Sequence, residues 1–234
     1  MELVNGTYSI QGLPVADICK EFGTPLYVYD GAKILEQLKS LKNAFSDTDV
    51  RIKYAAKALT NISILKLLKK NGAGIDVVSI QEAHLALGAG FLSHEIMYTP
   101  NCVAFDEIIE GVELGLNINL DNLSVLEKFG KKYGNTYPCC VRLNPHIMAG
   151  GNYKISTGHS NSKFGISVYQ LPQIMELAEK HKIIINGLHI HTGSEITETE
   201  VFLKMAEILF GIARDFPELK FIDFGGGLKV AYKE

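Results

Sequence analysis

Residues 51–89 read RIKYAAKALTNISILKLLKKNGAGIDVVSIQEAHLALGA. The stretch contains two short, mainly apolar runs, 51–56 and 74–78, and each is followed by a segment whose apolar residues recur three and four positions apart. Such runs are typical of buried strands, and such periodic segments are typical of amphipathic helices. The stretch therefore predicts two consecutive strand–helix units, which are the building blocks of a parallel sheet.

The same alternation continues through most of the chain. We predict seven strands, at residues 51–56, 74–78, 95–99, 117–120, 139–143, 184–191 and 221–224. Helices are predicted between them at residues 62–71, 80–89, 104–114, 122–133, 168–182 and 198–216, with Asp121, Ser167 and Thr197 as candidate N-caps. An alternating series of this kind indicates an α/β protein built on one parallel sheet.

The number of strands separates two possible architectures. A closed TIM-like (β/α)8 barrel needs eight strands, and only residues 228–234 follow the last glycine-rich loop of this 234-residue chain. An open doubly wound sheet tolerates any strand number, but it predicts a glycine-rich loop after its first strand, and residues 54–60 contain no glycine. We therefore expect a barrel that is truncated after its seventh strand.

Two segments lie outside the repeating pattern. Residues 144–165 form an irregular stretch that is long for a compact domain, which indicates an active-site loop. Residues 1–30 precede the first unit, and their runs at 8–10 and 25–29 predict a separate β element. We thus divide the chain into an N-terminal segment, 1–30, and a barrel domain, 31–234.

The composition favours a small-molecule partner. The chain has 47% hydrophobic and 21% charged residues and a formal net charge of −3, so there is no electrostatic case for nucleic acid or an anionic membrane. No apolar run reaches membrane-spanning length and the N-terminus does not resemble a leader, so we expect a cytoplasmic protein. The four cysteines have no CxxC spacing, and we expect reduced, buried thiols.

Lys57 is the most informative single residue. It ends the predicted strand 51–56, whereas other lysines, such as Lys66, Lys69 and Lys70, lie on polar helix faces where their charge is easily solvated. A lysine desolvated at a strand end becomes an amine nucleophile that can form a Schiff base. A strand-end lysine that extends to solvent is the alternative, and this segment alone favours neither.

Other polar side chains follow the predicted strands at their carboxyl ends, where βα folds place their sites. Two histidines on the sixth strand, His189 and His191, are two residues apart and therefore point to one face. The triple glycine after the seventh strand leaves backbone amides open to a phosphate. The complete set of positions is Asp76, Ser79, Glu82, Arg142, His189, His191, Ser194, Asp223, Gly225, Gly226 and Gly227.

One chemistry needs a Schiff-base lysine, a phosphate cradle and a ring that stacks, and that is pyridoxal phosphate chemistry. Lys57 would supply the amine, the glycine loop with Ser194 the cradle, and His191 the ring. The alternative for His191 is a core hydrogen bond across the barrel, and the alternative for His189 and His191 together is a metal site of the hydrolase type. A metal site would leave Lys57 and the glycines unexplained, so we expect no metal.

The chain resembles the fold-type III pyridoxal-phosphate-dependent decarboxylases. The resemblance rests on five ordered segments, YAAKAL at 54–59, GIDVVS at 74–79 with Glu82, SKFGI at 162–166, GLHIHTGS at 187–194 and DFGGGL at 223–228. It implies a barrel of the alanine racemase type and pyridoxal 5'-phosphate as cofactor. It also implies that Lys57 holds the cofactor covalently, that His191 stacks on its ring, and that Ser194 with Gly225, Gly226 and Gly227 binds its phosphate. Asp76, Glu82 and Arg142 would support the lysine and the ring.

The amino-acid sequence of segments 144–165 and 189–196 is most similar to that of the diaminopimelate-specific members of that family. The implied reaction is decarboxylation of meso-2,6-diaminopimelate to L-lysine. Ornithine, arginine or carboxynorspermidine decarboxylation, or a pyridoxal-phosphate-binding barrel without turnover, are the alternatives. The family continues with a Glu-Pro-Gly-Arg segment and a β domain, so we expect this chain to be an N-terminal part, inactive alone, with residues 1–30 joined to that β domain. The resemblance also implies a homodimer.

Overall fold

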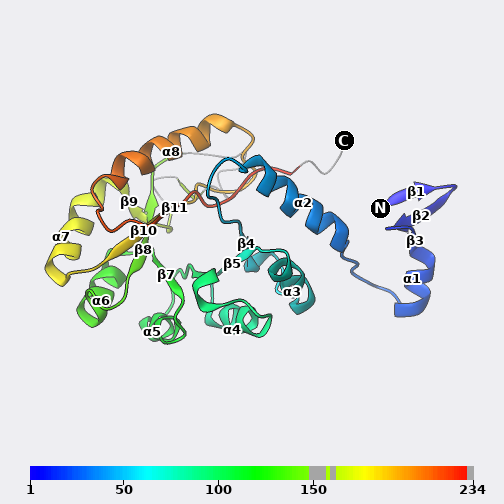
Figure 1. Ribbon diagram of the computed structural model, residues 1–234, viewed down its shortest axis with the longest axis horizontal. Helices are drawn as coiled ribbons and strands as arrows, with labels where there is room; N and C mark the ends of the chain where they lie inside the picture. Colours follow the sequence, from blue (N-terminus) through cyan, green and yellow to red (C-terminus); the bar gives the residue numbers. More distant parts are fainter. Residues whose placement is uncertain (148–156, 159–161, 231–234) are drawn as a thin grey trace.

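A computed structural model of the chain describes residues 1–147, 157–158 and 162–230. Its main feature is a curved sheet of seven parallel strands in the order β4-β5-β6-β7-β8-β10-β11 (Figure 1). These strands are β4 (Lys53–Ala55), β5 (Gly74–Val77), β6 (Ile96–Tyr98), β7 (Asn117–Leu120), β8 (Cys139–Asn144), β10 (Ile185–Ile190) and β11 (Phe221–Asp223). A short strand, β9 (Ile166–Ser167), pairs with β8. All seven predicted strands are confirmed, with ends shifted by at most two residues.

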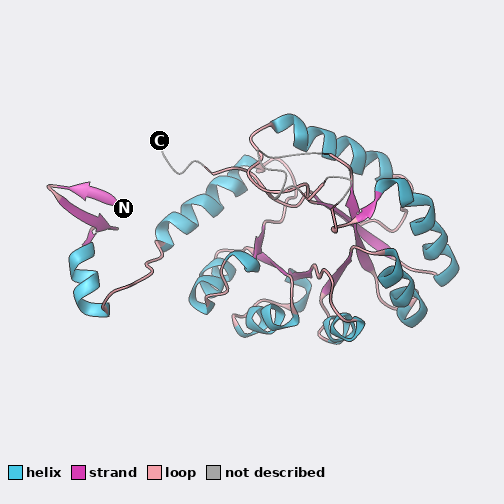
Figure 2. Cartoon of the chain, turned by 180° about the vertical axis from the view of Figure 1, so that it is seen from behind, coloured by secondary structure: helices cyan, strands magenta, loops and turns pink. Residues whose placement is uncertain are grey.

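Six helices cover the convex side of the sheet, and Figure 2 shows them on the outside of an open, curved layer of strands. They are α3 (Ile62–Lys70), α4 (Ile80–Gly88), α5 (Phe105–Glu113), α6 (Leu123–Tyr133), α7 (Leu171–His181) and α8 (Thr199–Ala213). All six correspond to predicted helices. Each strand-to-strand crossover along the path therefore runs through a helix on one side, as in a βα barrel.

The strands alternate between apolar residues that face the helices and smaller or polar residues that face the concave side. On β5, Ile75 and Val77 are fully buried in the core between sheet and helices. Asp76, between them, faces the concave side because successive side chains of a strand point to opposite faces. The same alternation gives the concave side Asn119 on β7 and Arg142 on β8. The helix-covered face thus carries the packing energy and leaves the concave face for polar groups.

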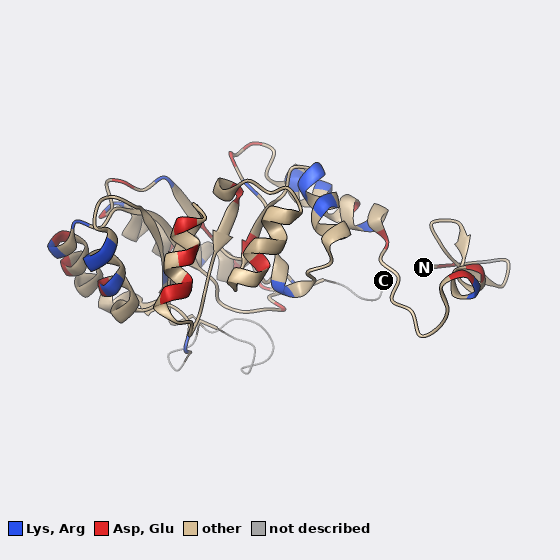
Figure 3. Cartoon of the chain, turned by 90° about the horizontal axis from the view of Figure 1, so that it is seen from below, with Lys and Arg blue, Asp and Glu red and all other residues tan. Residues whose placement is uncertain are grey.

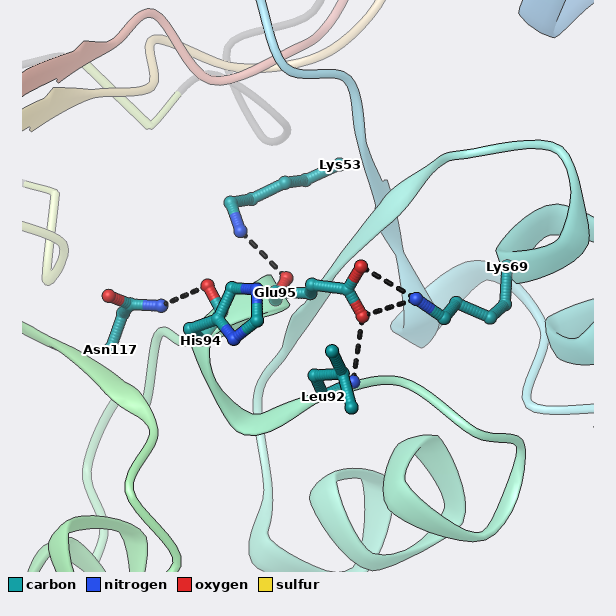
Figure 4. A network of polar contacts seen from close by, with 6 residues as sticks. All are labelled: Lys53, Lys69, Leu92, His94, Glu95 and Asn117. Atoms are coloured by element: carbon teal, nitrogen blue, oxygen red, sulfur yellow. Dashed lines mark hydrogen bonds and ion pairs between the residues drawn. The ribbon is translucent and has the colours of Figure 1, made fainter.

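A compact polar network closes the amino-terminal edge of the sheet (Figure 4). Lys69 Nζ of α3 lies 2.6 Å from both carboxylate oxygens of Glu95, and Leu92 donates its backbone N–H to Glu95 Oε2 at 2.7 Å. Lys53 Nζ of β4 donates to the Glu95 carbonyl oxygen at 2.7 Å. Asn117 Nδ2 of β7 donates to the His94 carbonyl at 2.9 Å. Glu95 therefore joins the loop before β6 to its neighbouring strand and helix.

The sheet does not close on itself within the described residues. β4 pairs only with β5, and β11 pairs only with β10, so both ends of the seven-strand path are edges. Some of the concave space near the amino-terminal edge is filled by the Phe221 ring, which lies against Gly187 of β10 where a Cβ would come within 2.2 Å of it. The architecture is the expected barrel without an eighth strand.

The first forty-four residues contain elements that the repeating pattern did not predict. Strands β1 (Glu2–Val4), β2 (Thr7–Ile10) and β3 (Leu13–Pro14) form a small antiparallel sheet that shares no strand pairing with the large one. Helix α1 (Val15–Phe22) follows, and α2 (Gly31–Ala44) leads to β4. Figure 1 shows the small sheet and α1 at a distance from the curved sheet. The expected strand at residues 25–29 is wrong, because these residues are extended without pairing.

Two of the three predicted N-caps are also wrong. Asn122, not Asp121, caps α6 by accepting the Ser124 N–H at 2.9 Å, while Asp121 Oδ2 accepts from Asn101 Nδ2 at 2.6 Å. Thr197 bonds to Glu198, and α8 has no side-chain cap. Ser167 does cap, by accepting the Tyr169 N–H at the start of the short 3-10 helix Val168–Gln170. The tertiary contacts of Asp121 explain the first difference.

Basic and acidic residues both occur along the outer helices, as the colouring of Figure 3 shows. No helix in the described part of the chain is long and apolar enough to cross a membrane.

Candidate functional site

The carboxyl ends of the parallel strands lie at one edge of the sheet, and most of the predicted site residues gather there. Lys57 lies in a short 3-10 helix, Ala56–Ala58, directly after β4. Its side chain is exposed, so of the two alternatives for this lysine the structure favours the one that extends to solvent. The physical reason is that β4 is an edge strand, with no neighbour on its outer side to cover the segment that follows it. Lys57 nevertheless acts electrostatically on Asp76, His189 and His191.

Asp76 of β5 is the half-buried carboxyl of the site. The pKa of Asp76 is raised to about 7, mainly by loss of contact with water and also by the nearby Asp223 carboxylate, while a hydrogen bond from Thr99 and the charges of Lys57 and Lys53 oppose the shift. Thr99 Oγ1 donates to Asp76 Oδ2 at 2.7 Å. The side chain therefore changes its charge near neutral pH, within the electrostatic reach of Lys57.

Thr99 and Asn119 take part in hydrogen bonds at the site that were not predicted from the sequence. Asn119 Nδ2 of β7 lies 3.3 Å from Thr99 Oγ1 and 2.8 Å from His189 Nδ1 of β10. His189 is buried, and burial lowers its pKa to about 4, so the ring is neutral at pH 7. The core hydrogen bond across the barrel, which the sequence suggested as an alternative for His191, is made by His189 instead. Thr99 and Asn119 could have been found from their positions on the concave side, two residues from Met97 and Asn117 on their strands.

His191 follows β10 and contacts the glycine loop. Its Nδ1 accepts the Gly226 N–H at 3.3 Å, so the end of β10 and the loop after β11 are joined. Burial lowers the pKa of His191 to about 3, and the neighbouring His189 and Arg142 act in the same direction. The imidazole is therefore a neutral, flat ring at the carboxyl end of its strand.

The glycine loop requires glycine at two of its three positions. Gly225 and Gly227 have φ angles of 64° and 105°, in the region that side chains disfavour. A Cβ on Gly227 would also lie 2.0 Å from the carbonyl oxygen of Gly193. At Gly226 a Cβ would meet no atom within 4 Å, so the backbone there is open. Ser194, next to Gly193, is exposed on the same side.

Arg142 is the buried cation of the site. It is 6% exposed on β8, and its guanidinium lies 4.7 Å from the centre of the Phe164 ring. Burial lowers its pKa, and the carboxylates of Asp121, Asp76 and Asp223 oppose that shift. Arg142 thus balances the negative charge that the three aspartates bring to this end of the sheet.

Glu82 is the one predicted carboxylate that takes a different part. Its own N–H donates to Ser79 Oγ at 3.2 Å, so Ser79 caps helix α4, and its Oε2 accepts the Val78 N–H at 2.8 Å, just before the helix begins. Among the described residues it has no hydrogen bond or ion pair with Lys57 or Asp76. The structure therefore gives Glu82 a helix-capping role beside the site.

The predicted active-site loop, 144–165, lies largely outside the described residues. Its described part includes Thr157, whose N–H donates to the Thr192 carbonyl at 2.9 Å and whose hydroxyl donates to the His191 carbonyl at 2.7 Å. This contact brings part of the segment to the end of β10, beside the predicted site.

The two histidines take part in hydrogen bonds. Nδ1 of His189 and Nδ1 of His191 are each engaged in a hydrogen bond, and no three His, Cys, Asp or Glu side chains of the described residues are grouped as metal ligands are.

All four cysteines are free thiols. Cys139 and Cys140 are buried as expected, and burial raises the pKa of Cys139 to about 12, but Cys102 is exposed. The expectation of burial is wrong for Cys102, which lies in the loop after β6.

Comparison with known proteins shows which family has a similar sequence and fold. Residues 31–234 match the family model described as pyridoxal-dependent decarboxylase, pyridoxal binding domain. The diaminopimelate decarboxylase of Methanothermobacter thermautotrophicus is 36% identical over 97% of this chain and 55% of its own length, and that of Archaeoglobus fulgidus is 33% identical over 98% and 56%. The chain thus spans little more than half the length of these curated relatives.

Solved structures give the same result. A crystal structure of diaminopimelate decarboxylase from M. jannaschii in complex with L-lysine superposes with a TM-score of 0.84 at 30% identity, covering 100% of this chain and 58% of that one. The lysine/ornithine decarboxylase of Vibrio vulnificus, in complex with putrescine, superposes with a TM-score of 0.80 at 28% identity, covering 94% and 57%. The chain belongs to the pyridoxal-dependent decarboxylases, and residues 31–234 match the pyridoxal-binding domain of that family.

Proposed function

We propose that this chain forms the pyridoxal-phosphate-binding part of an enzyme that decarboxylates meso-2,6-diaminopimelate to L-lysine. The observation that carries the proposal is the meeting of an exposed lysine amine, a titrating carboxyl, a neutral imidazole and an open glycine loop at one edge of the sheet. The names of the matching relatives support the choice of substrate.

The residues present fit pyridoxal phosphate. Gly226 presents a backbone with no neighbour at its Cβ position, and the exposed Ser194 hydroxyl lies beside Gly193, which contacts Gly227. Three acidic groups face the buried Arg142, so the field at the site is not uniformly negative. A loop of this kind binds phosphate through its amides because no side chain blocks the approach.

Each residue then has a role that follows from its chemistry. Lys57 would hold the cofactor through its amine, and Gly225, Gly226, Gly227 and Ser194 would bind the phosphate. His191, kept neutral by burial, would stack on the ring without adding charge to it.

The buried groups set the charge around Lys57. Asp76, whose pKa lies near 7, would accept or hold a proton beside the lysine amine, while Arg142 limits the negative potential. Glu82 would fix the segment after β5 by accepting the Val78 N–H. When bound, pyridoxal phosphate supplies an electron sink for the pair left behind when carbon dioxide departs.

A second candidate is decarboxylation of ornithine or lysine. The match to the Vibrio vulnificus lysine/ornithine decarboxylase supports it, at a TM-score close to that of the diaminopimelate decarboxylases. Arginine and carboxynorspermidine remain further alternatives. The described residues include those proposed for the pyridoxal site and offer no contact that distinguishes these substrates.

The proposal is tested by carbon dioxide release from meso-diaminopimelate, ornithine, lysine and arginine under the same conditions. We expect turnover with meso-diaminopimelate in a protein of the relatives' length, and none with residues 1–234 alone. Release from ornithine or lysine in preference to diaminopimelate would favour the second candidate. A protein that takes up pyridoxal phosphate but releases carbon dioxide from none of the four would favour a binding barrel without turnover.

We further propose that residues 1–30 are a unit distinct from the barrel domain, 31–234, and contact a β domain of the whole protein. The support is that β1, β2 and β3 pair only with one another, and that Leu3, Tyr8 and Leu13 are exposed. The family resemblance supports a cytoplasmic homodimer, which light scattering on the purified protein and cell fractionation would test.

A further inference from the structure

Four side chains on the concave face form one line of hydrogen bonds, which runs along β5, β6 and β7 and then passes over β8 to β10. Asp76 comes from β5, Thr99 follows β6, Asn119 comes from β7 and His189 from β10. The three links measure 2.7 Å from Thr99 Oγ1 to Asp76 Oδ2, 3.3 Å from Asn119 Nδ2 to Thr99 Oγ1, and 2.8 Å from Asn119 Nδ2 to His189 Nδ1. Thr99, Asn119 and His189 are 7%, 1% and 5% exposed, so water does not compete for these bonds.

The direction of each bond follows from the number of hydrogens available. The Thr99 hydroxyl has one hydrogen, which it donates to the Asp76 carboxylate, so toward Asn119 it offers only lone pairs. The Asn119 amide has two hydrogens, and they serve Thr99 and His189. His189 Nδ1 must then accept, which leaves the single proton of the neutral imidazole on Nε2. The Asn119 amide therefore donates both of its hydrogens, one to Thr99 and one to His189.

We propose that Asn119 is a positioning residue for the reaction at the pyridoxal site. Through Thr99 it orients the Asp76 carboxylate beside Lys57, and through Nδ1 it fixes His189 as the Nε2–H tautomer. This inference rests on the proposed function, because it assigns Asn119 to the support of groups that face the cofactor.

The unused oxygen of Asn119 supports a role beyond stability. Asn119 Oδ1 is buried and has no hydrogen-bond partner among the described residues. A buried amide oxygen without a partner lowers stability, so an apolar residue of the same size would suit packing better. The NH2 group, with both hydrogens in use, is the part of the side chain that accounts for asparagine at this position.

Charged groups surround both ends of the line, Asp76 and His189. The groups that act on Asp76 are Lys53 on β4, Lys57 after β4, and Asp223 on β11, and Arg142 and Cys140 on β8 face it in turn. The groups that act on His189 are Asp223, Arg142 and Lys57, and His191 lies beside it. Between the two ends, β6 and β7 contribute no titratable side chain to the line itself. Removal of a link therefore changes hydrogen bonding without removing a charge.

The test uses NMR of the folded protein, with and without pyridoxal phosphate. The imidazole nitrogens of His189 report the tautomer and are assigned with His189→Gln, and the carboxyl carbon of Asp76 reports its titration and is assigned with Asp76→Asn. The variants are Asn119→Leu, Thr99→Val and Thr99→Ser. The matched control is Asn117→Leu, because Asn117 lies on the same strand and bonds only to the His94 and Ile96 carbonyls.

The expected shifts have defined directions. The Thr99 bond favours the ionised form of Asp76, so Thr99→Val should raise the Asp76 midpoint by about one pH unit, and Thr99→Ser should restore it. Asn119→Leu should remove the donor to His189 Nδ1 and turn a single Nε2–H tautomer into a mixture. In the loaded, full-length enzyme, kcat should fall about tenfold or more with little change in KM, since substrate contacts are untouched.

The outcomes separate this inference from the proposed function. Unchanged resonances of both Asp76 and His189 in folded Asn119→Leu would overturn the positioning role, as would equal effects from Asn117→Leu. Thr99→Val keeps the test decisive where Asn119→Leu does not fold, since it replaces one hydroxyl by a methyl group. A protein whose wild-type form takes up no pyridoxal phosphate would contradict the proposed function, and the two resonances would still report the line of hydrogen bonds without cofactor.

Discussion

At the scale of single residues, the environment of each group decides its chemistry more than its type does. Burial and the Asp223 charge raise the pKa of Asp76 to about 7. His189 and His191 are both held neutral by burial, with pKa values of about 4 and 3. Lys57 is exposed beside them. An amine, a titrating carboxyl and neutral rings thus meet at one place.

Lys57→Ala tests the role of the amine. We expect the visible absorbance of the covalently held cofactor to disappear, because no other side chain at this position offers an amine, while stability changes by no more than about 0.5 kcal/mol, since the side chain is exposed. Absorbance spectra and borohydride treatment followed by mass spectrometry measure the effect. Lys66→Ala, an exposed lysine of α3, is the control. Persistence of the band in Lys57→Ala would contradict the assignment.

Acid stability tests the buried titratable groups. Between pH 6.5 and 5 the unfolded chain protonates His189 and His191 while the folded chain does not, so each lowers the free energy of unfolding by up to about 2 kcal/mol. Asp76 acts in the opposite direction, because its raised pKa makes the folded chain bind the proton first. The net expectation is a loss of about 2 kcal/mol in this interval, growing to about 4 kcal/mol in Asp76→Asn. Urea unfolding at both pH values measures it, and a smaller loss in Asp76→Asn than in wild type would contradict it.

At the scale of elements, the carboxyl-terminal and amino-terminal ends of the parallel strands have different roles. The carboxyl edge holds the site, whereas the amino edge holds the network around Glu95, which joins α3, β4 and the loop before β6 (Figure 4). The Lys69 ion pair and the Leu92 hydrogen bond lower the pKa of Glu95, because both favour its charged form. The amino edge is therefore a region of stability, as is general for βα barrels.

Glu95→Gln tests this division. The change removes the charge that faces Lys69 while keeping the shape, and we expect a loss of about 1–2 kcal/mol in the free energy of unfolding at pH 7. The wild-type contribution requires the ionised carboxyl, so it should vanish as the pH falls through the depressed pKa of Glu95. Chemical denaturation at pH 7 and pH 3 measures both effects, with Glu36→Gln, an exposed pair to Lys33, as control. A large loss of cofactor binding at unchanged stability would contradict the assignment.

At the scale of the whole molecule, the open sheet is the dominant feature. β4 and β11 each have one unpaired side within the described residues, and apolar side chains near them are exposed, among them Val50, Phe210 and Leu228. Unpaired strand edges are templates for pairing with another chain. The chain therefore presents two surfaces that favour association.

Residues 1–234 produced alone should consequently associate or aggregate. Light scattering across a range of protein concentrations measures the association, and hydrogen exchange reports whether the amides of β4 and β11 are protected. We expect a mass that rises with concentration, with edge amides exchanging faster than those of β7, which has neighbours on both sides. A stable monomer with slow exchange at both edges would show that the edges are covered in some other way.

The sequence by itself determined the elements that have strong periodicity. All seven strands and six outer helices were predictable, because each crossover unit has its own apolar pattern and its own breaks. The positions of Asp76, Arg142, His191 and the glycine loop were predictable too, since the carboxyl ends of parallel strands always meet at one edge. Helix α2 was missed, although Ile34, Leu38 and Leu41 recur in it at helical spacing, because it precedes the first strand–helix unit of the repeating pattern.

The tertiary structure decided what distance and burial control. The exposure of Lys57 depends on β4 being an edge strand, which no local pattern records. The line from Asp76 through Thr99 and Asn119 to His189 joins residues up to 113 positions apart, and it exists only because the sheet curves and brings their side chains together on its concave face. The helix-capping role of Glu82 likewise depends on the local structure before α4, where the Glu82 carboxylate accepts the Val78 N–H. Sequence periodicity specifies which face a residue is on, whereas hydrogen bonds and pKa values depend on what lies opposite that face.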